Sequence, residues 1–435
     1  MLGVMGVLIA IAVIIFMAYK GWGIIPASLL CALIVILTNH GDIWKSLSVD
    51  YVNGFKYFAG TYFLIFVLGA LFGQVMGESG SANSISYKLM DRFGESRAIL
   101  VVALATSILT YGGVNLFIVI FTVYPLALIL FKAADLPKRL IVATVGIGAG
   151  TFTMTAMPGS PSIQNLIPAQ VLGTTATAAP LMGIICSLFL FGAGVWYVQS
   201  RAKKAKANGE HFVPGPRDNM DKLSLTDASK LPDWKVAFLP LLVVIGVIFL
   251  LKGKMDALYG VSIALAVGII LTYVLNWKRF ENPLKALNDG CSNSVMALIN
   301  TAAIVGFGFV VQNVPAFQAF IKFALGMKFN PLVSEAIAVN VIAGITGSAS
   351  GGLTIFMKTM GPAFLQTGIS PEALHRVASI ASGGLDSLPH SGAVITLLMV
   401  MGLTHKEAYK DLGVVTVIIP LLATALAIAI GIFFY

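Results

Sequence analysis

Long runs of apolar residues dominate the chain, and short polar clusters separate or interrupt them. A membrane-spanning helix needs about 20 mostly apolar residues. Two polar stretches, 42–56 and 280–289, mix charged with apolar residues, which is typical of helices that lie in the membrane interface. We predict uncharged spanning helices at 2–19, 22–38, 60–77, 179–199, 236–251, 257–276, 294–311 and 412–433.

The uncharged run 98–131 is too long for one helix across a bilayer. Its 34 residues would form a helix of about 51 Å, whereas the hydrocarbon core measures about 30 Å. The sequence Thr110-Tyr-Gly-Gly113 interrupts the run. We therefore predict a re-entrant hairpin whose tip lies at Tyr111–Asn115, inside the protein or against a water-filled cavity.

The run 140–200 is also uncharged, over 61 residues. Its middle carries Pro158, Gly159 and Pro161 among many hydroxyl side chains. Proline and glycine at this spacing are incompatible with a continuous helix. The pattern predicts a helix that enters the membrane, breaks and changes direction.

The second half of the chain repeats this order of elements. Residues 336–357 carry a second candidate hairpin tip at Gly347–Gly352, and residues 377–404 carry a second break between Ser382 and Gly392. The polar linker 200–234 is rich in Lys and Arg, which places it in the cytoplasm. Counting spans from this linker gives the two halves opposite orientations, and inverted repeats with broken helices are typical of transporters.

The predicted fold is therefore an all-α multi-span membrane protein with two inverted repeats. Each repeat has a re-entrant hairpin and a Pro/Gly-broken helix. The expected divisions are spans at 1–77, the first hairpin and broken helix at 78–178, spans at 179–311 with the cytoplasmic linker 200–234, the second hairpin and broken helix at 312–404, and a last span at 405–435.

Composition limits the function further. Of the 435 residues, 57% are hydrophobic and 11% are charged, whereas about a quarter of a soluble protein is charged. This excludes a soluble enzyme, a nucleic-acid binder and a disordered scaffold. The net charge of +9 is then a property of cytoplasmic loops rather than a sign of nucleic-acid binding.

The two hairpin tips are candidate anion sites. Helix N-termini present unpaired N–H groups and partial positive charge, and glycine lets a ligand approach the backbone closely. Tight helix packing through small residues is the alternative explanation of such tips. The candidate residues are Gly112, Gly113 and Asn115 at the first tip and Ser348, Ser350 and Gly351 at the second.

Hydroxyl and amide side chains in the two breaks are candidates for binding the polar groups of a substrate. They are Thr153, Ser160, Asn165 and Ser387, and Ser162 and Gln164 belong to the same stretch as Ser160. Capping of the free helix ends is the alternative role for these side chains.

Asp386 and His390 are the candidates for coupling transport to protons. Asp386 is the one formally charged residue that the sequence 377–404 contains, and a carboxylate within a membrane segment is costly and usually functional. His390 lies four residues further on and titrates near neutral pH. A sodium site built from oxygens of Ser348–Ser350 and Thr153–Thr155 is an alternative, and structural capping is another.

Fixed positive charge is absent from the sequence of both predicted breaks. A site without fixed cations suits a monocarboxylate better than a di- or tricarboxylate.

Three further ionisable residues, Glu335, His375 and Arg376, fall near predicted helix ends. We expect them to be solvated or interfacial.

The motifs Thr110-Tyr-Gly-Gly-Val-Asn115, Leu136-Pro-Lys-Arg139, Thr151-Phe-Thr-Met-Thr-Ala-Met-Pro-Gly-Ser-Pro161 and Ile163-Gln-Asn165 resemble the gluconate permease (GntP) family of the ion transporter superfamily. This resemblance covers nearly the whole chain. It implies a homodimeric symporter of the bacterial inner membrane, usually driven by protons, in which a hairpin-bearing domain moves against a scaffold. It also implies a hydroxy-carboxylate substrate, such as gluconate or 3-hydroxybutyrate.

The sequence thus predicts a secondary active symporter for a small hydroxy-monocarboxylate, with H⁺ as the coupling ion and Na⁺ as the alternative. An uncoupled anion channel or facilitator is a second alternative. An intramembrane hydrolase using Ser391 beside His390 is disfavoured, because adjacent helical residues do not face each other. We expect no enzymatic activity, cofactor, metal or nucleic acid, and we expect contact with membrane lipid.

Overall fold

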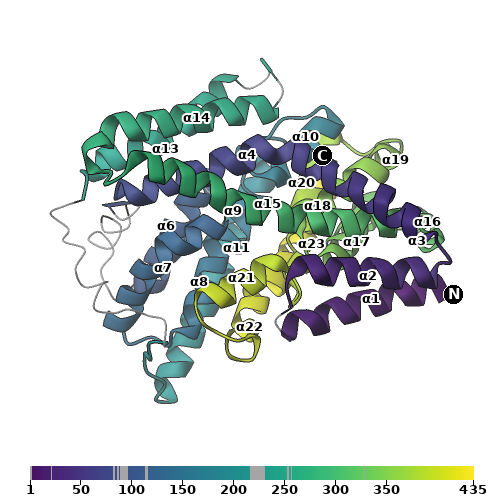
Figure 1. Ribbon diagram of the computed structural model, residues 1–435, viewed down its shortest axis with the longest axis horizontal. Helices are drawn as coiled ribbons and strands as arrows, with labels where there is room; N and C mark the ends of the chain where they lie inside the picture. The colour runs from purple at the N-terminus through teal and green to yellow at the C-terminus, as the bar shows by residue number, and fades with distance from the viewer. Residues whose placement is uncertain are drawn as a thin grey trace.

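The computed structural model of this chain consists of helices wherever it is described, and Figure 1 shows their arrangement. The described part comprises residues 2–20, 22–81, 84–85, 88, 97–112, 116–215, 231–251, 254–255, 257–327 and 329–435. The all-α prediction is therefore confirmed for these residues.

Long apolar helices form the outer framework. Four helical runs, Ile43–Glu78, Pro180–Ala207, Leu258–Arg279 and His405–Phe434, are long and apolar enough to cross a membrane. The protein is thus a multi-pass membrane protein. The framework helices are α1 (Leu2–Tyr19), α2 (Ile24–Thr38), α4 (Val52–Glu78), α11 (Pro180–Ala207), α13 (Trp234–Leu251), α14 (Ala257–Asn276), α15 (Pro283–Asn313) and α23 (Ile419–Phe434).

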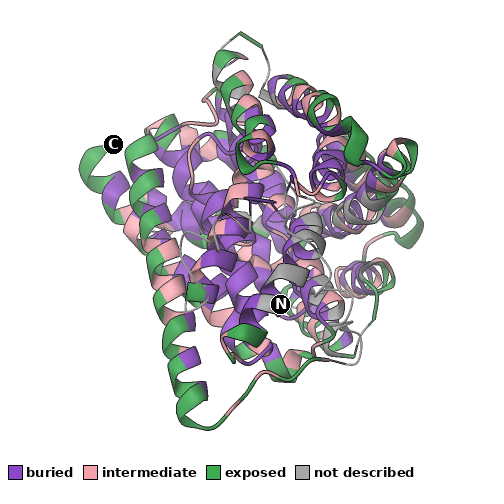
Figure 2. Cartoon of the chain, turned by 90° about the vertical axis from the view of Figure 1, so that its left-hand side faces the viewer, coloured by how far each residue is buried: buried purple, intermediate pink, exposed green. Residues whose placement is uncertain are grey.

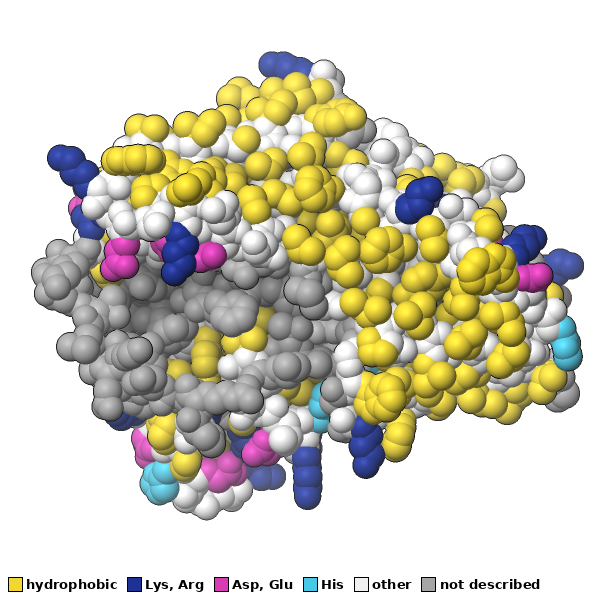
Figure 3. All heavy atoms as spheres, viewed as in Figure 1, with side chains coloured by type: hydrophobic (Ala, Val, Ile, Leu, Met, Phe, Trp, Pro, Cys, Tyr) yellow, Lys and Arg dark blue, Asp and Glu magenta, His cyan; other side chains and the backbone are white. Residues whose placement is uncertain are grey.

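The outer faces of these helices are apolar. Leu188, Leu242 and Val274 have 69%, 60% and 70% of their surface exposed, which water would not favour over so wide an area. In Figure 3 hydrophobic side chains spread over α14 at the top and over α1 and α2 at the lower right. Contact with lipid explains this exposure.

Helices α4 and α15 pack against each other at the centre of the framework. Glycine on each side permits the close approach near the start of α4. A Cβ atom on Gly54 would come within 2.8 Å of the Val305 carbonyl oxygen, and one on Gly306 within 2.9 Å of the Tyr51 carbonyl oxygen. Any larger residue at these two positions would push the helices apart.

The two polar stretches that we expected to form interfacial helices linking spans are continuous with longer helices. Stretch 42–56 forms α3 (Ile43–Lys45) and the π-helical turn η1 (Ser46–Tyr51), which continue directly into α4. Stretch 280–289 runs into α15, whose first turn is capped by the Asn282 side chain accepting a bond from the Lys285 N–H. Their location in the membrane interface stays a prediction.

Both predicted hairpins are present on either side of their tips. Helices α6 (Ala98–Tyr111) and α7 (Leu116–Ala133) pack together, as do α17 (Pro331–Thr346) and α18 (Ala349–Thr359). At 14 and 11 residues, α6 and α18 measure about 21 and 17 Å. Neither is long enough to cross a bilayer, as the sequence predicts.

Both broken helices are also present. The first consists of α8 (Arg139–Ala149), the short α9 (Phe152–Thr155) and α10 (Ile163–Leu172). The second consists of α20 (Pro371–Ser382), the 3₁₀ turn η5 (Leu385–Ser387) and α21 (Gly392–Val400). The remaining elements are α16 (Pro315–Leu325), α19 (Gly361–Leu365), α22 (His405–Gly413), the 3₁₀ turn η4 (Trp277–Arg279) and the π-helical turn η6 (Val414–Ile418).

The packing of the two halves is paired. Helix α6 contacts α8 as α17 contacts α20, and α11 contacts α8 as α23 contacts α20. Between the halves, α10 contacts α18 as α21 contacts α7. This pairing is what an internal repeat produces, while the opposite orientation of the halves and the division into domains stay predictions.

The interior holds two clusters of buried apolar side chains, and buried residues occupy the centre of the helix assembly in Figure 2. One cluster includes Phe66 and Ile304, and the other includes Ile65, Leu116 and Leu397. Residues from both clusters line one cavity, which therefore lies where the clusters meet.

Candidate functional site

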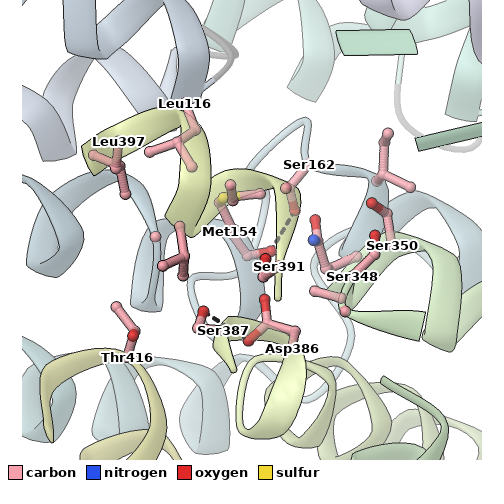
Figure 4. Close-up of a pocket in the computed structure, with 18 of the residues that line it drawn as sticks. Leu116, Met154, Ser162, Ser348, Ser350, Asp386, Ser387, Ser391, Leu397 and Thr416 are labelled. Carbon is pink, nitrogen blue, oxygen red and sulfur yellow. Dashed lines mark hydrogen bonds between the residues drawn. The ribbon is translucent and has the colours of Figure 1, made fainter. Parts of the chain in front are cut away.

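A cavity of about 170 Å³ lies between the hairpin tips, the two breaks and the central helices (Figure 4). This volume exceeds by about tenfold the 10–15 Å³ that one water needs, so a small organic molecule can occupy it. Its polar lining residues are Thr110, Ser162, Gln164, Asn300, Ser348, Ser350, Asp386, Ser387, Ser391 and Thr416.

Four helices of the hairpins and breaks begin at this cavity. The first residues of α7, α10, α18 and α21 (Leu116, Ile163, Ala349 and Gly392) all line it. The first N–H groups of a helix have no partner within the helix, and the helix dipole places partial positive charge there. Four such ends at one cavity favour an anionic group.

The second hairpin tip is shaped by Gly347 and Ser348. Gly347 adopts the left-handed conformation, with φ of +58°, and ends α17. Ser348 begins α18, because its Oγ accepts a hydrogen bond of 3.1 Å from the Gly351 N–H. Ser348 and Ser350 line the cavity whereas Gly351 does not, so Gly351 serves the cap.

The first hairpin tip is described only at its edges. Gly112 is buried beside the Leu241 side chain and does not line the cavity, although Thr110 and Leu116 on either side of the tip do. The candidate residues Gly113 and Asn115 lie outside the described residues. Their predicted role in anion binding stays a prediction.

Three candidate residues in the first break contact the surrounding protein rather than the cavity. The Thr153 hydroxyl donates to the Gly148 carbonyl at 2.5 Å, and the Asn165 amide donates to the carbonyls of Met157 and Ser160 at 3.1 Å each. Ser160 is fully buried. None of the three lines the cavity, whereas Ser162 and Gln164 of the same segment do.

The second break places Asp386 and Ser387 at the cavity. The Ser387 hydroxyl donates to Asp386 Oδ1 at 3.0 Å, as Figure 4 shows. His390 does not line the cavity. It lies under the second tip, where a Cβ on Gly347 would be 2.8 Å from its ring.

Asp386 is the one ionisable residue in the described lining of the cavity, which includes no Lys, Arg or His. Among the described residues no group of three or more His, Cys, Asp or Glu side chains could hold a metal ion. The cavity therefore combines positive helix ends with a single carboxyl group.

The positions that we expected to be solvated or interfacial are instead fully buried: Glu335, His375 and Arg376. Helices α17, α20 and α23 pack against one another, which encloses the first turns of α17 and α20. Arg376 belongs to the first half of the broken helix, so that element does contain a fixed cation. Its guanidinium donates to Asn165 Oδ1 and to the carbonyls of Ala176 and Ala178, and it does not reach the cavity lining.

Some lining residues were missed by sequence reasoning. Asn300 of α15 and Thr416 of η6 face the cavity from elements that read as plain spans. The amide of Asn300 inside an apolar run was the one available signal. Thr110 could have been found, because it directly precedes the predicted tip. Ser391 was weighed only as a nucleophile.

Comparison with known proteins shows what the chain resembles. It is 39% identical over 452 aligned positions to the uncharacterized transporter YxjC of Bacillus subtilis, covering 95% of both chains. It is 26% identical over 395 positions to an uncharacterized transporter of Haemophilus influenzae, covering 88% of both. No protein-family model matches the chain.

The fold of this chain also resembles that of a solved structure. The crystal structure of the YdaH transporter of Alcanivorax borkumensis, described as having an unusual topology, matches with a TM-score of 0.56. The match covers 90% of this chain and 89% of that chain at 17% identity. These relatives are named as transporters without a substrate, so the substrate and the gluconate permease family stay predictions.

Proposed function

This chain belongs to the same family of membrane transporters as YxjC, and we propose that it is a secondary active symporter for a small hydroxy-monocarboxylate. The relatives support transport rather than catalysis. The observation that carries the proposal is the meeting of four helix N-termini at a cavity whose described lining has one carboxyl group and no fixed cation.

The substrate carboxylate binds at the helix ends. The starts of α10, α18 and α21 supply N–H donors, and Ser348, Ser350 and Ser391 add hydroxyl groups beside them. Figure 4 places Ser162, Ser348 and Ser350 on one side of the cavity, with Ser391 between them and Asp386. Hydrogen bonds to an ionised acceptor are stronger than those between neutral groups, so these donors suffice without lysine or arginine.

The lining also has an apolar part. It includes Ile65 and Phe66 of α4, Ile304 of α15, Leu116 of α7 and Leu397 of α21. A substrate carbon chain packs on this part more favourably than several hydroxyl groups would. This supports a short acid of the 3-hydroxybutyrate type over a sugar acid of the gluconate type.

Asp386 couples substrate binding to a proton. It shares the cavity with the substrate carboxylate, and two like charges in one site disfavour each other's ionised state. The complex is stabilised when Asp386 is protonated, so one proton accompanies one monocarboxylate and the net movement of charge is zero. Sodium bound to cavity oxygens is the alternative coupling ion.

The proposal extends to the assembly. The hairpins and broken helices pack mainly on one another and move as one body against the scaffold, and the protein is a homodimer of the bacterial inner membrane. The paired packing of the halves supports the first statement. The bacterial origin of both relatives supports the location.

Uptake by proteoliposomes tests the coupling. We expect labelled 3-hydroxybutyrate to accumulate above equilibrium when the lumen is alkaline, and a protonophore should abolish the accumulation. Accumulation that follows an imposed sodium gradient would instead establish sodium coupling. Equilibration without accumulation under either gradient would identify a channel or facilitator.

Asp386→Asn sharpens this test. The variant should lose accumulation driven by the pH gradient and keep exchange of substrate across the membrane, because a neutral amide replaces the protonated carboxyl. Glu281→Gln is the matched control, since Glu281 is exposed and outside the cavity lining. Undiminished accumulation by Asp386→Asn would refute the coupling role of Asp386.

A further inference from the structure

Two buried side-chain oxygens of the cavity lining have no hydrogen-bond partner within the described protein. They are Thr110 Oγ1 and Gln164 Oε1. Gln164 is 1% exposed. Buried polar atoms are almost always paired, and each exception calls for an explanation such as a missing ligand. Both atoms belong to residues that line the cavity, so a bound substrate is the available partner.

Gln164 is held in place by its backbone while its side-chain oxygen stays unpaired. The Ser379 hydroxyl of α20 donates to the Gln164 carbonyl at 2.8 Å. The next residue, Asn165, accepts a bond of 2.6 Å from the Arg376 guanidinium. These contacts fix the first turn of α10 against α20. A side chain on such a braced segment can discriminate between ligands, because it cannot move to suit each one.

The chemistry of the unpaired atom determines what it can recognise. An amide oxygen only accepts hydrogen bonds. The carboxylate of the substrate also only accepts, so it cannot satisfy this atom. A substrate hydroxyl carries the donor that is required. Thr110 can donate or accept, so it is less selective.

We propose that Gln164 recognises the hydroxyl group of the substrate and thereby selects hydroxy acids over acids that lack a donor at that position. The inference rests on the proposed function and assigns one feature of its substrate. It also replaces Thr153, Ser160 and Asn165 as the partners of that hydroxyl, since these three do not line the cavity.

Three acids of nearly equal size test the proposal on the unaltered protein. They are 3-hydroxybutyrate, butyrate, which lacks the oxygen, and acetoacetate, whose ketone accepts but does not donate. We expect 3-hydroxybutyrate to compete for uptake roughly tenfold or more better than either of the others, because each leaves Gln164 Oε1 unpaired. Equal competition by acetoacetate would overturn the proposal.

The variant Gln164→Met links this preference to the residue. Its side chain has similar length and lacks the amide acceptor, so 3-hydroxybutyrate should lose affinity while butyrate keeps it, and the ratio should approach one. Gln366→Met is the matched control, because Gln366 is exposed at the end of α19. An equal loss for all three acids would indicate a structural role and refute the assignment.

Two further outcomes separate this inference from the proposed function. If none of the acids competes or is transported, the proposed function fails. If Gln164→Met shifts the pH profile of uptake and leaves the preference unchanged, the amide pairs with protonated Asp386 rather than with substrate, and the inference alone is overturned.

Discussion

The two broken helices occupy corresponding places in the two halves, yet they are held by different means. The first break, 150–162, is closed largely by its own side chains. The hydroxyls of Thr151, Thr153 and Ser162 donate to carbonyls of Ile147, Gly148 and Met154 at 2.6, 2.5 and 2.6 Å. From outside, Arg376 binds the carbonyls that follow α10 and the side chain of Asn165.

The second break, 383–391, is held by side chains from other elements. Asn340 of α17 accepts from the Leu385 N–H at 3.2 Å. From α22, the Tyr409 hydroxyl donates to the Ser387 carbonyl at 3.0 Å, and the His405 ring lies 2.8 Å from the Pro389 carbonyl. The position of Asp386 therefore depends on α17 and α22.

The two breaks therefore present different kinds of side chain to the cavity. The first break and the turn that follows it present neutral groups, Ser162 and Gln164, on a segment held by its own hydroxyl groups and by Arg376 and Ser379 of α20. The second presents the titratable Asp386 on a segment whose bonds come from its neighbours. A shift of α22 or of α17 would thus move Asp386, the residue for which we propose a coupling role.

Replacing Arg376 should lower the stability of the protein more than any of the changes that follow. Arg376→Met removes a buried guanidinium that makes four hydrogen bonds, and of their acceptors the Ala176 carbonyl keeps a bond from the Gly159 N–H. We expect the free energy of unfolding to fall by roughly 3 kcal/mol. The matched change at the second break, Tyr409→Phe, removes one neutral hydroxyl and should cost about 1 kcal/mol. Unfolding in detergent measures both, and equal losses would mean that the two breaks are held equally firmly.

Much of the fold was predictable because its signals are local. Charge-free runs fix the spans, and Gly112, Pro158, Gly347 and Pro389 interrupt them where the structure has its tips and breaks. Proline and glycine weaken a helix wherever they occur, and where they cluster with hydroxyl residues the helix ends, whereas the single Pro168 and Pro240 lie inside α10 and α13. Four candidate residues, Ser348, Ser350, Asp386 and Ser387, lie at the cavity, and their roles there stay predictions.

The features of the site that could not be predicted from the sequence depend on tertiary contacts. Arg376 ends the sequence Pro-Glu-Ala-Leu-His-Arg, which reads as a solvated first turn. Only folding brings the carbonyls of Ala176 and Ala178 to its guanidinium. Likewise, nothing in the sequence shows that Thr153 is turned toward Gly148 while Gln164 faces the cavity. Side-chain direction inside a break is set by the bonds of that break, not by helical periodicity.

Changes at the two hairpin tips should differ in their effect on stability, and the larger effect should be of intermediate size. Gly347→Ala would place a Cβ in the left-handed conformation and 2.8 Å from the His390 ring. We expect a loss of about 1–3 kcal/mol in stability and weaker substrate binding, because the Ser348 cap shifts. Gly112→Ala is the control, since Gly112 has an ordinary φ of −71° and its Cβ would come closest to the end of the Leu241 side chain, with the Leu109 and Ile108 carbonyls at 3.4 and 3.5 Å. Thermal unfolding and substrate competition for both variants check this order, and a larger effect at Gly112 would reverse it.

Removing the cap at the start of α22 should have the smallest effect on stability. In the first half, the N–H of Ala179, the residue before α11, donates to the distant Glu372 carboxylate at 3.0 Å, whereas α22 is capped locally by Thr404 and Glu407. Bonds from the Thr404 hydroxyl and N–H lower the pKa of Glu407. A lowered folded-state pKa contributes stability above the unfolded value, near 4.3, that is lost as the pH falls through the folded value. Thr404→Ala should therefore cost about 1 kcal/mol at pH 7 and less at a pH below 4. Unfolding measured at both pH values tests this, and a cost that does not change with pH would show that the Glu407 carboxylate takes no part in the cap of α22.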